Sequence, residues 1–146
     1  FFIPICAASD SGGMEYIMEK RAKFYKCSIC GKIIDIIDDT GVDTICCGKP
    51  MEELTANTVE ASTEKHLPAA EIDGDTIKVK IGTVEHPMVD EHYIKWISVI
   101  SANRVQRVSL SPHQKPEAVF VVPETGDVEV YEYCNLHGLW KTTLKK

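Results

Sequence analysis

The sequence predicts an all-β protein in which a small metal-binding module precedes an antiparallel β-sandwich. Two observations carry this prediction. Between residues 23 and 51, two pairs of cysteines enclose a segment with few apolar side chains, whereas from residue 76 onward short runs of alternating apolar and polar residues are separated by turn residues. The 146 residues suffice for a domain of roughly 90 residues and such a module. We place the module at residues 19–54 and the sandwich at residues 55–146.

Residues 1–18 are expected to form a tail outside the folded part of the chain. The first eight residues are apolar, but they are few and lack the basic stretch of a secretory signal. A clipped signal peptide is the alternative. Met14 and Met18 are both candidate start sites, which would make the residues before them an artefact of expression or start-site assignment. Cys6 then has no predicted role.

The charge balance excludes two classes of partner. With 16 Lys+Arg against 22 Asp+Glu the net charge is −6, the opposite of the basic balance that nucleic acids and anionic membrane surfaces select. No run of 18 or more apolar residues occurs, so no membrane-spanning helix is expected. We therefore expect a soluble protein without nucleic-acid or membrane partners. Reduced thiols and the lack of a clear export signal favour the cytoplasm.

The segment from Lys23 to Met51 is expected to fold as a hairpin that depends on a metal. Its pattern is a short strand, a C-x-x-C-Gly knuckle, an apolar strand at Ile33–Ile37, a turn at residues 38–41 and a return strand into Cys46. Its few apolar side chains cannot offset the entropy that ordering the backbone costs. A bound metal would supply the missing stabilisation.

The rest of the chain shows the period of two that is typical of half-buried strands. In residues 76–82 the apolar Ile77, Val79 and Ile81 alternate with two lysines, which places them on one face. Short strands separated by turn residues favour an antiparallel sandwich. One helical turn near residues 58–64 is expected as a connector. Further strands are expected at residues 93–100, 104–110, 118–122 and 128–133.

Four cysteines of the module have the spacing of a metal site. A C-x-x-C pair and a vicinal pair deliver four thiolates from two turns, and four sulfurs around a tetrahedral ion suit zinc or a single iron. A disulfide between vicinal cysteines would need a strained ring, so metal is preferred. Gly31 and Gly48 follow the two pairs, where a positive φ lets N–H groups point at sulfur. The ligands are Cys27, Cys30, Cys46 and Cys47, and their spacing does not distinguish iron from zinc.

A second set of candidate ligands lies in the sandwich. Cys134 and His137 are three residues apart at the end of a predicted strand, a spacing typical of metal ligands. His86 precedes a proline that restricts the backbone, and His92 follows six residues later, so one loop can present both rings. The fifth histidine, His113, fits an ordinary surface residue. The candidates are His66, His86, His92, Cys134 and His137.

The stretches that carry these residues resemble desulfoferrodoxin, the two-iron superoxide reductase. The similarity runs from about residue 23 to residue 140 and includes every ligand position in order, so it is more specific than any single motif. Only the residues before Met14 have no counterpart. The matching stretches are CSIC at 27–30, CCG at 46–48, EKH at 64–66, EHPM at 85–88, EHYIKWI at 91–97 and EYCNLHG at 132–138.

The resemblance implies the fold and chemistry of both sites. It implies a rubredoxin- or desulforedoxin-like iron in the module and an immunoglobulin-like sandwich, hence two iron ions per chain. The reaction would be the one-electron reduction of superoxide to hydrogen peroxide, with electrons from a small redox protein such as rubredoxin. A homodimer is also implied. The second iron would be held equatorially by His66, His86, His92 and His137 and axially by Cys134, with the sixth position open in the ferrous state.

Two charged residues beside His66 are candidate catalytic residues under this resemblance. Lys65 would attract superoxide and donate to the bound oxygen, because a positive charge stabilises developing peroxide. Glu64 would occupy the vacated iron position after electron transfer. Ordinary solvated side chains are the alternative for both residues.

Three other functions are compatible with parts of the pattern. A non-enzymatic electron-transfer protein with two iron centres explains the four-cysteine module but gives no reason for five ligands with an open position. A superoxide dismutase would also have to oxidise superoxide. A zinc-stabilised scaffold with an incidental histidine cluster would be separated from the others by its metal content.

Overall fold

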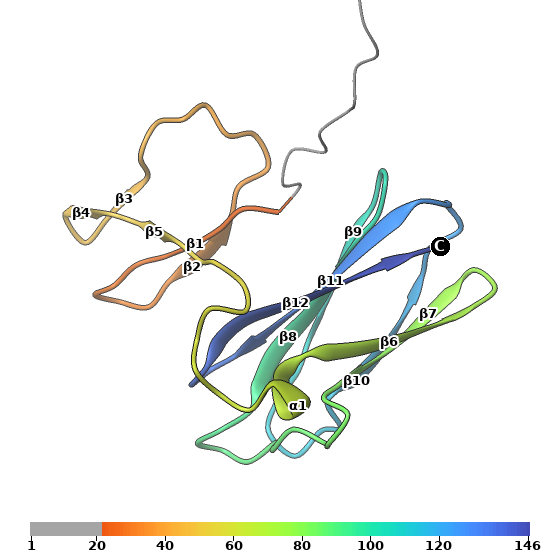
Figure 1. The fold of residues 1–146 in the computed structure, drawn as a ribbon. Helices are drawn as coiled ribbons and strands as arrows, with labels where there is room; N and C mark the ends of the chain where they lie inside the picture. Colours follow the sequence, from red (N-terminus) through yellow and green to blue (C-terminus); the bar gives the residue numbers. More distant parts are fainter. Residues whose placement is uncertain (1–21) are drawn as a thin grey trace, which may run out of the picture.

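The computed structural model describes residues 22–146, so the expected tail at residues 1–18, with Cys6, lies outside the described residues. Strands dominate the described part of the chain, and its α-helix is a single turn (Figure 1). All strand pairs are antiparallel. Among residues 22–146, no helix has the length and apolar character needed to cross a membrane. The prediction of an all-β chain is confirmed.

The module that begins the described chain contains five short strands. Their bounds are β1 Phe24–Lys26, β2 Ile33–Asp35, β3 Ile45–Cys46, β4 Lys49–Pro50 and β5 Glu52–Glu53. They form a three-stranded sheet in the order β2-β1-β5 and a two-stranded sheet of β3 and β4 (Figure 1). The knuckle with Cys27 and Cys30 joins β1 to β2, and the vicinal cysteines lie where β3 turns into β4.

The predicted hairpin across residues 38–41 is wrong in its pairing. The apolar strand ends two residues before Ile37, whose side chain is 95% exposed, and β2 pairs with β1 instead of with the return strand β3. Two contacts of Asp39 explain the difference: Lys23 Nζ donates to its Oδ2 at 2.6 Å, and Gly41 N donates to its Oδ1 at 2.8 Å. These contacts hold the segment as a loop that cannot extend a ladder.

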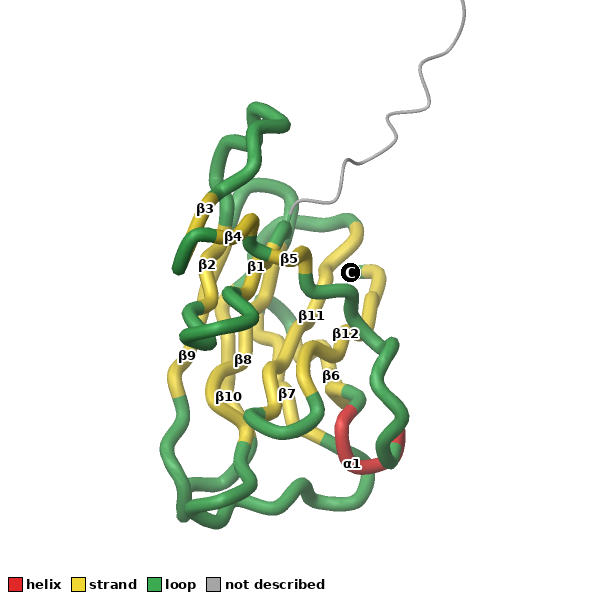
Figure 2. The backbone as a smooth tube through the Cα atoms, turned by 90° about the vertical axis from the view of Figure 1, so that its left-hand side faces the viewer, coloured by secondary structure: helices red, strands yellow, loops and turns green. Residues whose placement is uncertain are grey.

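Two antiparallel sheets packed face to face form the second unit (Figure 2). Its strands are β6 Pro68–Asp73, β7 Thr76–Ile81, β8 Ile94–Ile100, β9 Val105–Ser109, β10 Glu117–Val121, β11 Asp127–Cys134 and β12 Gly138–Lys145. One sheet has the order β10-β7-β6 and the other the order β12-β11-β8-β9. The predicted immunoglobulin-like sandwich is confirmed.

Two strands and the helix differ from the sequence expectation. The pattern does not predict β6, which begins with a proline and contains two alanines, because such residues are weak strand formers. Pairing of all six residues with β7 overrides that weakness. Strand β12 was missed because Thr142 and Thr143 interrupt its alternation, yet it pairs with β11 over its whole length. The helical turn α1 spans Thr63–His66, later than expected.

The sandwich core lies between the inner faces of the two sheets. Ile77, Val79 and Ile81 of β7, predicted to share one face, are each no more than 1% exposed. They pack with buried residues of β8 and β11, among them Ile97 and Val130. Full burial of each such side chain contributes about 1.5–3 kcal/mol, which fixes the register of the strands that carry them.

The module packs on the outer face of the four-stranded sheet. The ring of Phe24 lies 5.1 Å from that of Trp96 between centroids, and Lys26 Nζ donates to Tyr133 Oη at 3.0 Å. Side chains alternate along β11, so Tyr133 belongs to this contact whereas Cys134 belongs to the sandwich core. Strand β11 therefore serves both units, one with each face.

Candidate metal centres

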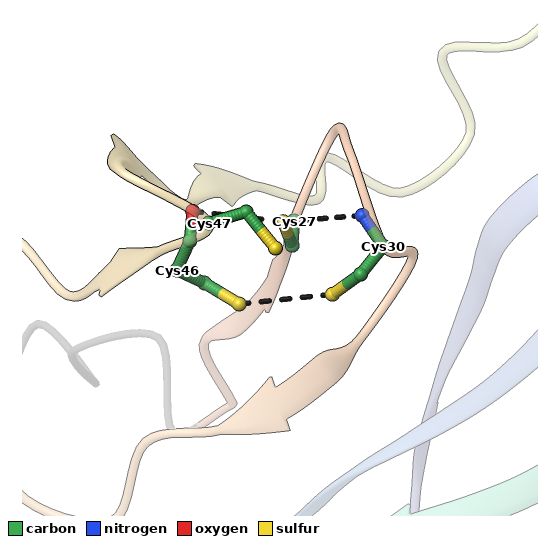
Figure 3. A group of neighbouring side chains, drawn as sticks. All are labelled: Cys27, Cys30, Cys46 and Cys47. Carbon is green, nitrogen blue, oxygen red and sulfur yellow. Dashed lines mark hydrogen bonds between the residues drawn. The ribbon is translucent and has the colours of Figure 1, made fainter.

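The four predicted cysteine ligands of the module converge on one point (Figure 3). Their sulfur atoms all lie within 4.8 Å of one another. Cys30 Sγ is 3.7 Å from Cys46 Sγ, and the backbone N–H of Cys30 donates to Cys27 Sγ with an N–S distance of 3.4 Å. Gly31 and Gly48 have φ values of 77° and 75°, the left-handed conformation predicted for them. The two turns thus surround a position for a tetrahedral ion.

The protonation of these thiols favours a shared cation. Hydrogen bonds from the backbone N–H groups of Cys30 and Ile29 lower the pKa of the Cys27 thiol to about 6, so this sulfur is a thiolate at neutral pH. A hydrogen bond with Cys30 raises the pKa of the Cys46 thiol to about 12. Cys47 also has a hydrogen bond with Cys30, which raises the pKa of the Cys47 thiol. All four sulfurs can ionise together only when a cation compensates their charge.

Four of the five predicted ligands in the sandwich form a second group. Their ligand atoms lie within 4.8 Å of one another, and the group consists of His66, His92, Cys134 and His137. His66 ends α1 and Cys134 ends β11, while His137 lies in the turn before β12 and His92 in the loop before β8. Because some of these residues are as much as 71 positions apart, only the folded sandwich brings them together.

His86 joins the same group. Its Nε2 lies 3.2 Å from His66 Nε2, and its ring centroid is 4.6 Å from that of His92. The side chain is 2% exposed. The structure therefore gathers all five residues that the sequence singled out in the sandwich.

The tautomers of two histidines indicate that a cation binds between their rings. His66 Nδ1 lies 2.7 Å from the carbonyl oxygen of Ser62, and His86 Nδ1 lies 2.7 Å from that of Pro87. A carbonyl oxygen only accepts, so in the neutral rings each Nδ1 carries the proton and each Nε2 presents a lone pair. Two lone pairs 3.2 Å apart cannot form a hydrogen bond. A bound metal turns this repulsion into coordination, and carbonyl-anchored imidazoles are the usual arrangement of histidine ligands.

Burial keeps these rings in the neutral form that binds metal. Burial lowers the pKa of His66 and His92, and it lowers the pKa of His86 to about 4. A neutral imidazole needs no deprotonation before it coordinates. His92 Nε2 is buried without a hydrogen-bond partner among residues 22–146. Such an orphaned nitrogen is explained by a metal that the ring would bind.

Two features of its surroundings change the pKa of the Cys134 thiol in opposite directions. Burial raises the pKa of the Cys134 thiol, whereas hydrogen bonds from the backbone N–H groups of His137 and Leu136 lower it.

Glu132, two residues before Cys134, is fully buried, and within the described chain its carboxyl oxygens have no hydrogen-bond partner. Burial raises the pKa of Glu132 to about 9, so the carboxyl is neutral at pH 7. The sequence pattern gave no reason to single out Glu132.

Glu64 and Lys65 lie on α1 directly before His66, and both side chains are exposed. The charge of Lys65 contributes to lowering the pKa of His66 and His92, after burial as the main cause. Its ammonium is therefore within electrostatic reach of the second centre. The main chain of Glu64 also has a structural contact, because its carbonyl oxygen accepts from Val84 N at 3.2 Å.

Asn135 braces the loop that carries His92, and sequence reasoning missed it. Its Oδ1 accepts from Tyr93 N at 2.9 Å, and its Nδ2 donates to the carbonyl oxygen of Glu91 at 3.0 Å. The residue thereby ties the β11–β12 turn to the neighbouring ligand loop. Its place between two candidate ligands is the signal that would have pointed to it.

A solved structure of known activity shares this fold. The superoxide reductase of Treponema pallidum matches with a TM-score of 0.67 at 31% identity, covering 83% of this chain and 98% of that one. The four-cysteine group and the histidine–cysteine group each supply the donors that iron accepts. Fold and sites together define a two-iron protein of the superoxide reductase type.

Two family models cover both units. The model described as Desulfoferrodoxin, N-terminal domain, matches residues 19–54, and the model described as Desulfoferrodoxin matches residues 58–143. The desulfoferrodoxin of Syntrophotalea carbinolica is 46% identical over 125 residues, covering 86% of this chain and 98% of that protein. The superoxide reductase of Pyrococcus horikoshii is 33% identical over 100 residues, covering 56% of this chain and 87% of that protein. The chain belongs to the desulfoferrodoxin family, and its cofactors are two iron ions, one in each unit.

Proposed function

We propose that the chain is a superoxide reductase that adds one electron to superoxide and yields hydrogen peroxide at the second centre. The observation that carries the proposal is the convergence of four imidazoles and one cysteine beside an exposed lysine. Ferrous iron bound there supplies the electron. The proposed ligands of this centre are His66, His86, His92, Cys134 and His137, and those of the first centre are Cys27, Cys30, Cys46 and Cys47.

The charges of the ligand residues suit an anionic substrate. An imidazole binds a metal in its uncharged form, so a single thiolate would offset only half of the charge of a divalent metal, and one positive charge would remain to attract superoxide. Lys65 adds a second positive charge at the exposed side, and its ammonium can donate to an oxygen that gains negative charge. Glu64 lies next to it and is the proposed carboxylate that would bind the iron after electron transfer.

The electron donor in this proposal is a small redox protein such as rubredoxin. Cys30 and Cys47 of the first centre are exposed to solvent, so a donor has access to that centre as well. We further propose that the protein is a homodimer and that it works in the cytoplasm, where the five thiols among the nine proposed ligands stay reduced.

The stoichiometry of the reaction tests the proposed function. The iron-loaded protein is reduced without oxygen and mixed with a known amount of superoxide, and peroxide and oxygen are measured. About one peroxide per superoxide without oxygen is expected of a reductase. About half a peroxide per superoxide with oxygen would indicate a dismutase. Consumption at the spontaneous rate would leave a two-iron electron carrier as the better assignment.

Replacing Lys65 with alanine is expected to slow the reaction with superoxide about tenfold at low ionic strength, because attraction by a fixed positive charge accelerates association. The dependence of the rate on salt should also become flatter. Stopped-flow mixing of the pre-reduced protein with superoxide measures both quantities.

Lys145→Ala is the matched control for this prediction, since Lys145 is also exposed but lies at the end of β12 remote from the ligand turn. Its rate should stay near that of the wild type. Equal rates for Lys65→Ala and the wild type at low salt would remove Lys65 from the mechanism.

A further inference from the structure

Trp140 contacts two proposed ligands of the second centre at once. The residue lies on β12 and is 3% exposed. Its ring is stacked on that of His66, with centroids 4.9 Å apart and an interplanar angle of 25°. Its Nε1–H donates to the carbonyl oxygen of His137 at 3.1 Å. One side chain thus links ligands that are 71 residues apart in the sequence.

The stack on Trp140 completes the fixation of the His66 ring. At one edge, His66 Nδ1 is held by the carbonyl oxygen of Ser62 at 2.7 Å. That bond alone leaves the plane of the ring free to tilt about it, whereas a parallel indole on the ring face opposes the tilt. The imidazole is therefore fixed in direction and in plane, with its Nε2 toward His86 and His137.

The bond from Trp140 to the His137 carbonyl acts on the backbone of the ligand turn. His137 lies between β11 and β12, and its Nδ1 faces both His66 Nε2 at 3.0 Å and Cys134 Sγ at 3.9 Å. A shift of this backbone would move the imidazole relative to both neighbours. The indole N–H holds the carbonyl, and Trp140 itself is held by its pairing with Glu132 on β11.

We propose that Trp140 is a positioning residue that sets the geometry of His66 and His137 for iron in the second centre. This role rests on the ligand set given under the proposed function, since it concerns the same ligands, and it does not depend on the reaction proposed there. Groups that orient metal ligands typically change metal affinity or activity 10–100-fold when they are removed. A tryptophan that only filled the core would change stability without changing the iron site.

Three variants of the full-length, iron-loaded chain test this role. Trp140→Leu removes both the stack and the N–H donor, and Trp140→Phe keeps a ring but removes the donor. Trp96→Phe is the matched control, because Trp96 is the other tryptophan of the chain and belongs to the contact between the module and the sandwich. The measurements are the rate at which a chelator removes iron from the second centre and the electron paramagnetic resonance spectrum of the ferric protein.

Trp140→Leu is expected to release second-centre iron 10–100-fold faster and to change the ferric spectrum, with Trp140→Phe between it and the wild type. Trp96→Phe should match the wild type in both measurements. Release from Trp140→Leu at the Trp96→Phe rate, with an unchanged spectrum, would overturn the proposal. If Trp140→Leu does not fold, as judged by circular dichroism, an unchanged spectrum and release rate in Trp140→Phe would overturn it.

The same set of proteins separates this inference from the proposed function. Peroxide formed per superoxide consumed by the wild type tests the reaction and does not depend on Trp140. A wild type without peroxide formation, combined with faster iron release from Trp140→Leu, would reject the reaction and keep the positioning role. Normal peroxide formation by the wild type, combined with iron release from Trp140→Leu at the wild-type rate, would reject the positioning role alone.

Discussion

Cys134→Ser is expected to abolish peroxide formation at the second centre. The Cys134 side chain is fully buried at the end of β11, so no other thiol can take its place. A serine hydroxyl stays protonated at neutral pH and is a poor replacement for a soft thiolate donor. Because removal of groups that merely orient ligands costs 10–100-fold in metal affinity, loss of a ligand should cost about 100-fold or more. Iron content and peroxide yield measure the effect.

Cys30→Ser is the reciprocal variant, since it removes an exposed ligand of the first centre only. Cys134→Ser should retain the iron of the first centre, and Cys30→Ser should retain the reaction of the pre-reduced second centre with superoxide. Normal peroxide formation by Cys134→Ser would contradict the proposed ligand set. If Cys30→Ser loses the iron of the first centre and also the reaction of the pre-reduced second centre with superoxide, the second centre depends on the first.

Gly82→Ala is expected to lower the free energy of unfolding by about 3 kcal/mol. Gly82 has a φ of 82°, which costs a residue with a Cβ about 1–2 kcal/mol. The added Cβ would also clash with the carbonyl oxygen of Val84, and it would lie 2.7 Å from the carbonyl oxygen of Lys65 and 2.8 Å from that of Glu64. Backbone atoms cannot rotate away, and forced shifts of this kind typically cost a further 1–3 kcal/mol. Denaturant unfolding of the iron-loaded protein measures the change.

Gly74→Ala is the control for the backbone term, because Gly74 has a φ of 60° but no atom within 4 Å of an added Cβ. Gly74→Ala should therefore cost only the backbone term, about 1–2 kcal/mol. Two of the three carbonyls near Gly82 belong to α1, so Gly82→Ala should also displace His66 and alter the ferric spectrum, whereas Gly74→Ala should not. Equal unfolding free energies for the two variants would show that the packing around Gly82 can yield.

The candidate ligands were predictable from the sequence because metal chemistry restricts the residue types and their local spacing. The C-x-x-C pair and the Cys134-x-x-His137 pair each come from one turn, and the structure gathers both sets of candidates. Strand pairing in the module was less predictable. The loop around Asp39 depends on a contact with Lys23, sixteen residues away, which no local pattern contains.

The supporting residues of the second centre were harder to predict than its ligands. Asn135 and Trp140 act through hydrogen bonds to backbone atoms, and any residue can supply such an atom. Glu132 looks like a solvated charge in the sequence, yet the register of β11 directs it into the core. These roles follow from the alignment of β11 with β8 and β12, a long-range property of the fold.

The spacing of the ligands along the chain sets the order in which the two centres can form. Contacting residues of the first centre, Cys27 and Cys46, are 19 positions apart, whereas His66 and His137 are 71 apart. Closing the longer loop costs about 1 kcal/mol more in chain entropy, and contacts between distant residues form late in folding. The first site can assemble from a short N-terminal segment during synthesis. The second must wait for β11 and β12 to pair, so capture of iron there marks a sandwich that has finished folding.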